Sequence, residues 1–102
     1  GDIEDEHDRK RKKLVSRKVS DNVYELAGRL EIENINEQYD LDIPEDDDYQ
    51  TLAGFLLFHL EELPEEGETF RIDNFIFTIL KKTAAKIELV RLEVVSDDDN
   101  KE

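Results

Sequence analysis

The stretch from Tyr49 to Leu63 constrains the fold most, because it carries apolar side chains at helical spacing between two prolines. Its stripe consists of Leu52, Phe55, Leu56, Leu60 and Leu63. Pro44 forbids continuation of the preceding short helix, and Pro64 ends the central one. Asp47 or Asp48 is predicted to cap the first turn, since a carboxylate there accepts unpaired N–H groups. The pattern predicts one central helix.

Further apolar residues, among them Phe58, widen this helix beyond a single face. Either the helix is sandwiched inside the domain or Phe58 meets a second surface. We expect the internal arrangement, because a small domain needs most of its large apolar side chains inside. Gly54 predicts that another backbone approaches this helix closely. His59, beside the stripe, is predicted to be structural, with a pH-sensitive contact as its functional alternative.

The remaining apolar residues predict strands and one more helix. Alternation of apolar and polar residues is typical of half-buried strands, and Ser20-Asp21-Asn22 favours a hairpin turn. The predicted elements are strands at Val15–Val19 and Val23–Gly28, a helix at Glu31–Tyr39, the central helix, and strands at Thr69–Ile72, Phe75–Leu80 and Ile87–Val94. The order β-β-α-α-β-β-β predicts an α+β domain with a small mixed or antiparallel sheet packed on two helices.

The charge is distributed unevenly along the 102 residues, whose net charge is −14. Between Arg29 and Arg71 there is no lysine or arginine, whereas fourteen aspartates and glutamates occur there. Such a surface repels DNA and RNA, so we expect no nucleic-acid partner. The basic run at residues 9–13 follows acidic residues that neutralise it, which is typical of a linker.

The domain organisation follows from where apolar residues occur. We expect a linker at residues 1–14, a folded domain at 15–95 and a disordered acidic tail at 96–102. No apolar run approaches the length that crosses a bilayer, so we expect no direct membrane insertion by this segment. The sequence contains no cysteine, which excludes disulfides and thiolate chemistry.

Residues for catalysis are scarce, and we expect neither an enzyme nor a bound cofactor. Neither histidine, His7 or His59, belongs to a recognisable catalytic pattern, and there is no glycine-rich phosphate loop. The acidic residues of loop 40–48 include the candidate metal ligands Asp46, Asp47 and Asp48. Because the glycine and closing glutamate of a calcium loop are missing, diffuse attraction of cations is favoured over a specific site.

Two apolar features could form interfaces: the wide central helix and the last strand. On the helix the candidates are Phe58 and His59. On the strand, Ile87, Leu89 and Leu92 leave room for pairing at a sheet edge, and Leu89 is the interface candidate. Packing in the core is the simpler alternative for both features.

Five segments, in order and with matching gaps, resemble the CorC/HlyC transporter-associated domain. Residues 22–30 (NVYELAGRL) are similar to the family's opening G-S-Y-x-V-x-G-R-L, and residues 51–54 (TLAG) to the start of its main helix. Residues 63–68 (LPEEGE) resemble its I-P-x-x-G-E turn, while residues 77–79 (FTI) and 86–92 (KIELVRL) resemble its closing strands. Residues 1–8 (GDIEDEHD) are similar to the segment that follows paired CBS domains in these proteins.

The resemblance implies a fold similar to the flavin-binding (PCMH-like) half of certain oxidases, without a flavin motif. It implies a regulatory or accessory domain of a membrane ion transporter of the magnesium and cobalt efflux or hemolysin-like type. Its partners would be the CBS pair and membrane domain of the same chain, at the cytoplasmic face of the membrane, with a homodimer as a further arrangement. The alternative function is a direct sensor of divalent cations or a small ligand through loop 40–48.

Overall fold

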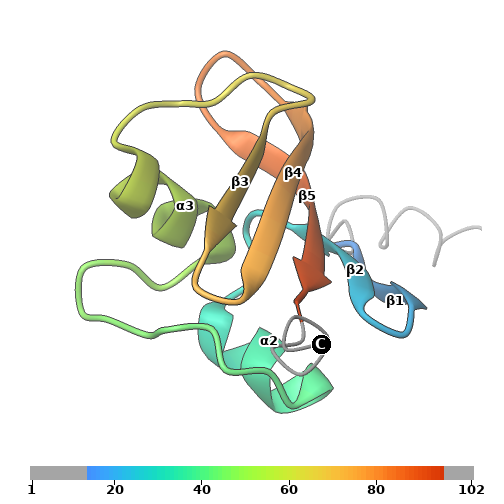
Figure 1. Cartoon of the computed structure of the whole chain (residues 1–102). Coiled ribbons are helices and arrows are strands. Elements are labelled where there is room, and N and C mark those ends of the chain that lie inside the picture. The colour runs from blue at the N-terminus through green and yellow to red at the C-terminus, as the bar shows by residue number, and fades with distance from the viewer. Residues whose placement is uncertain (1–13, 96–102) are drawn as a thin grey trace, which may run out of the picture.

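The computed structural model of the chain describes residues 14–95 (Figure 1). The predicted acidic tail at 96–102 and residues 1–13 of the predicted linker lie outside the described residues. The elements are β1 (Ser16–Ser20), β2 (Val23–Ala27), α2 (Ile32–Tyr39), α3 (Leu52–Leu60), β3 (Thr69–Ile72), β4 (Phe75–Lys82) and β5 (Ile87–Val94). The predicted α+β class and element order are confirmed.

The five strands form one antiparallel sheet in the order β1-β2-β5-β4-β3. Of the two interpretations of the last strand, an edge open for pairing is wrong and packing within the domain is confirmed, because β5 lies in the centre of the sheet. One side of β5 pairs with β2, where Leu26 is opposite Val90, and the other pairs with β4, where Phe77 is opposite Leu92. Both long sides of β5 are therefore occupied by sheet hydrogen bonds.

The helices and their connecting loop lie along one side of the sheet and close a single core (Figure 1). The strands contribute the buried side chains Tyr24, Leu26, Phe75, Phe77, Ile79, Ile87, Val90 and Leu92. The helices and the loop contribute Ile32, Ile35, Ile43, Tyr49, Leu52, Phe55 and Leu56. Each large apolar side chain that is fully removed from water stabilises the fold by roughly 1.5–3 kcal/mol.

Helix α3 is shorter than the predicted helix and is capped by Thr51. The Thr51 side-chain oxygen accepts a hydrogen bond from the N–H of Gly54 at 3.1 Å. The predicted cap at Asp47 or Asp48 is wrong, because these residues lie in the preceding loop and the first helical residue is Leu52.

The chain stays extended before α3 because its backbone is already paired with the segment that enters α2. Thr51 forms an isolated antiparallel bridge with Glu31. The N–H of Ile32 donates to the carbonyl oxygen of Gln50 at 2.8 Å. These contacts delay the start of α3 and place Tyr49 in the core rather than at a helix end.

The C-terminus of α3 is set by Glu61, which adopts a left-handed conformation with φ of 67°. Its N–H donates to the carbonyl oxygen of Leu57 at 2.7 Å, closing the last turn. Leu60 and Leu63, predicted to continue the core stripe, are only half-buried. The fully buried stripe is therefore confined to the first two turns of the helix.

A close backbone approach was predicted at Gly54, but the closest one is at Gly28. A β-carbon on Gly54 would meet side-chain atoms of Thr51 and Tyr49 at 3.2 and 3.3 Å. A β-carbon on Gly28 would overlap the carbonyl oxygen of Ile87. Gly28 therefore marks the point where β2, β5 and the start of α3 come closest together.

Candidate docking surface

The helical side of the domain carries almost all of its unbalanced charge. Residues 30–70, which include both helices, hold the fourteen carboxylates predicted from the sequence and no lysine or arginine. The described strands and turns outside this range carry eight basic and five acidic residues. The charge is thus strongly uneven along the chain, with the negative charge in α2 and in the loops on either side of the helices.

Asn36 organises the acidic loop that follows α2. Its side-chain amide donates to the carbonyl oxygen of Ile43 and its side-chain oxygen accepts from the Ile43 N–H, both at 2.9 Å. The same amide donates to a Glu45 carboxylate oxygen at 3.2 Å. The bonding of the Asn36 side chain to the loop was not predicted from the sequence. An asparagine inside a short helix was the available signal, since such side chains often bond to nearby backbone.

The candidate metal ligands Asp46, Asp47 and Asp48 are all exposed at the tip of this loop. An Asp46 carboxylate oxygen accepts from the N–H of Asp48 at 3.0 Å, which shapes a turn. No group of three or more histidine, aspartate or glutamate side chains within residues 14–95 is arranged to hold a metal ion. Within that range the loop geometry therefore accounts for this turn without a cation.

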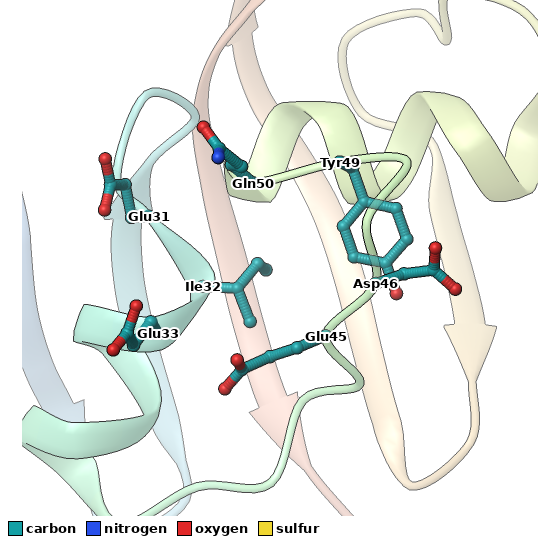
Figure 2. Close-up of a pocket in the computed structure, with 7 residues that line it drawn as sticks. All are labelled: Glu31, Ile32, Glu33, Glu45, Asp46, Tyr49 and Gln50. Atoms are coloured by element: carbon teal, nitrogen blue, oxygen red, sulfur yellow. The ribbon is translucent and has the colours of Figure 1, made fainter.

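A shallow pocket of about 190 Å³ lies between the start of α2 and the acidic loop (Figure 2). Its lining includes the carboxylates of Glu31, Glu33, Glu45 and Asp46. Figure 2 shows Glu45 reaching across Ile32 toward Glu33, whereas Asp46 points away on the side of Tyr49. The carboxylates are thus spread around the rim and do not converge on one point.

Tyr49 connects the acidic loop to α3. Its hydroxyl donates to the carbonyl oxygen of Pro44 at 2.9 Å, and only 9% of the residue is exposed. Burial, followed by the negative charges of Asp46 and Asp48, raises the pKa of the Tyr49 phenol above its ordinary value. Asp46, which is bridged to Tyr49, and Asp48 are both exposed to water.

Phe58 projects from α3 beside Tyr49 and remains 47% exposed. The internal position expected for Phe58 is therefore wrong, because the sheet covers only the opposite face of the helix. The centroids of the Phe58 and Tyr49 rings are 5.3 Å apart. His59 is also exposed, and its ring centroid lies 4.6 Å from that of Phe55 and 5.4 Å from that of Phe58. These rings form one continuous aromatic cluster.

Leu89 does not belong to this surface. It is half-buried in the central strand β5, where it pairs with Ala27 on one side and Lys81 on the other. Leu89 therefore lies within the sheet, among strands, whereas Phe58 and His59 lie on the helical side.

No helix within residues 14–95 has the length and apolar composition needed to cross a membrane.

Comparison with known proteins identifies what this domain resembles. Residues 17–96 match the CorC_HlyC family, described as a transporter associated domain. Hemolysin C of Brachyspira hyodysenteriae is 29% identical over 99 residues, which cover 97% of this chain and 36% of that protein. The magnesium and cobalt efflux protein CorC of Escherichia coli is 27% identical over 97 residues, covering 95% of this chain and 32% of CorC. The chain thus spans about a third of the length of these curated relatives.

The fold is found in solved structures as well. The transporter associated domain CorC_HlyC from Nitrosomonas europaea superposes with a TM-score of 0.72 and 26% identity. The match covers 82% of this chain and all of that one.

Proposed function

Because this chain belongs to the CorC_HlyC family of transporter-associated domains, we propose that it is the accessory domain of a longer ion-transport protein. The observation that carries the proposal is the family match over residues 17–96, within relatives about three times as long. The transported ions would be those of the magnesium and cobalt efflux type. The domain would work beside a CBS pair and a membrane domain of the same protein, at the cytoplasmic face.

The proposed role is regulatory and non-catalytic. His59 is the one histidine within residues 14–95, and its ring packs edge-to-face against Phe55 and Phe58. A general base needs a reacting partner within hydrogen-bond reach, and the neighbours of this ring are aromatic. Its surroundings favour a packing contact over proton transfer. The domain would therefore influence transport by docking on another part of the transporter.

The proposal is tested by removing the domain from the full-length transporter. Flux of Mg²⁺ and Co²⁺ is measured in proteoliposomes for the intact protein and for a variant that lacks residues 15–95. We expect the variant to insert and transport, with an altered dependence of flux on ion concentration. A flux curve that is identical for the two proteins would contradict a regulatory role.

The alternative proposal is a direct sensor of divalent cations or a small ligand through loop 40–48. The carboxylates around the pocket in Figure 2 are the observation that favours it. Calorimetry on the 102-residue chain separates the two proposals. Saturable binding of Mg²⁺, Co²⁺ or Ca²⁺ at micromolar concentration, lost in Asp46→Asn with Asp47→Asn, would support the sensor. Weak binding without saturation would support the docking role.

A further inference from the structure

We propose that Phe58, Tyr49, His59, Asp46 and Asp48 form an aromatic–acidic surface that binds an arginine- or lysine-bearing protein segment. The proposal rests on the proposed docking function and adds to it the place of docking and the chemistry of the partner. The surface has two parts. One is the exposed ring of Phe58 on α3, and the other is the pair of exposed carboxylates of Asp46 and Asp48 in the loop before α3.

The aromatic part of the surface is held in place before any partner binds. Four large apolar residues are markedly exposed within residues 14–95: Leu14, Val15, Val19 and Phe58. Phe58 is the aromatic member of that set. Its ring packs against that of Tyr49. The Tyr49 ring is held by Phe55, with 5.4 Å between the two ring centroids, and by the hydrogen bond from its hydroxyl to the Pro44 carbonyl oxygen. An exposed ring on a rigid support loses little entropy when a partner covers it.

The acidic part lies next to the same rings. Asp46 is bridged to Tyr49 through the backbone, and Figure 2 shows its carboxylate near the hydroxyl end of the Tyr49 ring. Burial, and after it the charges of Asp46 and Asp48, raises the pKa of Tyr49. Residues 30–70 contain no lysine or arginine, so no basic residue close in sequence can neutralise these carboxylates.

Charge decides which occupant fits. The faces of aromatic rings attract cations, and nearby carboxylate oxygens can accept hydrogen bonds that an arginine guanidinium donates. A second copy of the chain that packed through the same surface would bring an equal set of fourteen carboxylates against the first, and nucleic acid or an anionic bilayer would bring phosphates. Each of these is repelled. A basic protein segment is the occupant that the surface complements.

The test uses the 102-residue chain and a capped peptide of three Arg-Gly repeats as the probe. Affinity is measured by NMR titration or calorimetry in about 20 mM NaCl, where screening is weak. Phe58→Leu keeps an apolar side chain and removes the ring, so we expect affinity to fall about two- to fivefold. Asp46→Asn with Asp48→Asn preserves the acceptor oxygen of Asp46 and should weaken binding about threefold or more.

The matched control is Asp21→Asn with Glu88→Gln. It removes the same two negative charges from exposed positions outside residues 30–70 and should change affinity less than twofold. Equal losses in the control and in the Asp46 and Asp48 variant would overturn the proposal, because net charge alone would then explain binding. Absence of binding at low salt would also overturn it.

Failure here is distinguishable from failure of the proposed function. If removal of residues 15–95 alters ion flux but the peptide does not bind at this surface, the accessory role stands and the docking chemistry is wrong. If the peptide binds as expected but domain removal leaves flux unchanged, the surface exists and the regulatory role is wrong.

Discussion

The ring of Phe58 packs 5.3 Å from that of Tyr49, yet Phe58 is 47% exposed whereas Tyr49 is only 9% exposed. The two side chains are in contact, but Tyr49 belongs to the buried core and Phe58 lies at the surface. Leu56, on the opposite face of α3, is fully buried. We expect Leu56→Ala to lower the free energy of unfolding by about 2–5 kcal/mol, because it leaves a cavity. Phe58→Ala should lower it by about 1 kcal/mol or less. Urea unfolding measures both, and equal losses would place Phe58 in the core after all.

Gly28→Ala is expected to destabilise the domain by about 1–3 kcal/mol, since a β-carbon there overlaps the Ile87 carbonyl oxygen. The backbone has little freedom to yield, because the Gly28 N–H donates to Glu88 and its carbonyl accepts from Ala53. Gly54→Ala is the comparison: Gly54 is not among the glycines with positive φ, and an added β-carbon there would meet only side-chain atoms, at 3.2 and 3.3 Å, as its two nearest contacts. Thermal unfolding compares the two. An unchanged midpoint for Gly28→Ala would contradict the close packing of β2, β5 and α3.

Glu61→Gly should stabilise the domain by up to about 1 kcal/mol. The residue adopts φ of 67° just after α3, a conformation that glycine accepts without strain. The change also removes a negative charge from the negative end of the helix dipole. Glu62→Gly is the control, since Glu62 is not among the residues with positive φ. Urea unfolding that finds Glu61→Gly no more stable than Glu62→Gly would contradict the left-handed end of the helix.

Stability should fall at alkaline pH partly because of Tyr49. Burial and the neighbouring carboxylates raise the pKa of Tyr49 in the folded chain above its ordinary value of 10.0. The neutral phenol is therefore favoured by folding, and its contribution is intact below about pH 10 and lost as the pH rises further. Urea unfolding from about pH 8 to pH 11 should show a steeper decline for the native chain than for Tyr49→Phe. Identical slopes would contradict the placement of Tyr49 among carboxylates.

The periodic parts of the chain could be predicted from sequence, and the long-range contacts could not. The strand from Ile87 to Val94 was predicted with the bounds that it has, because alternation is a local signal. Its central place in the sheet depends on pairing with β2, about sixty residues away, which no local pattern reveals. The sequence therefore left both an edge and a core position open for this strand.

The start of α3 and the exposure of Phe58 were also beyond local reasoning. Asp48 satisfies the rule for a helix cap, but the pairing of Thr51 with Glu31 holds the chain extended past it. Phe58 is apolar and helical, which indicates burial, but the sheet packs on the other face of α3. The candidate surface was thus predicted in part. Phe58, His59, Asp46 and Asp48 were named as candidates, whereas the place of Tyr49 between them came from the tertiary structure.

Photocrosslinking from position 58 in the full-length transporter tests the central claim most directly. Benzoylphenylalanine replaces Phe58 in one variant and the exposed Glu88 of the sheet in a control. We expect the probe at position 58 to crosslink to a lysine- or arginine-bearing segment elsewhere in the transporter, and the probe at position 88 to give little product. Equal crosslinking from both positions, or none from position 58, would contradict docking through the aromatic–acidic surface.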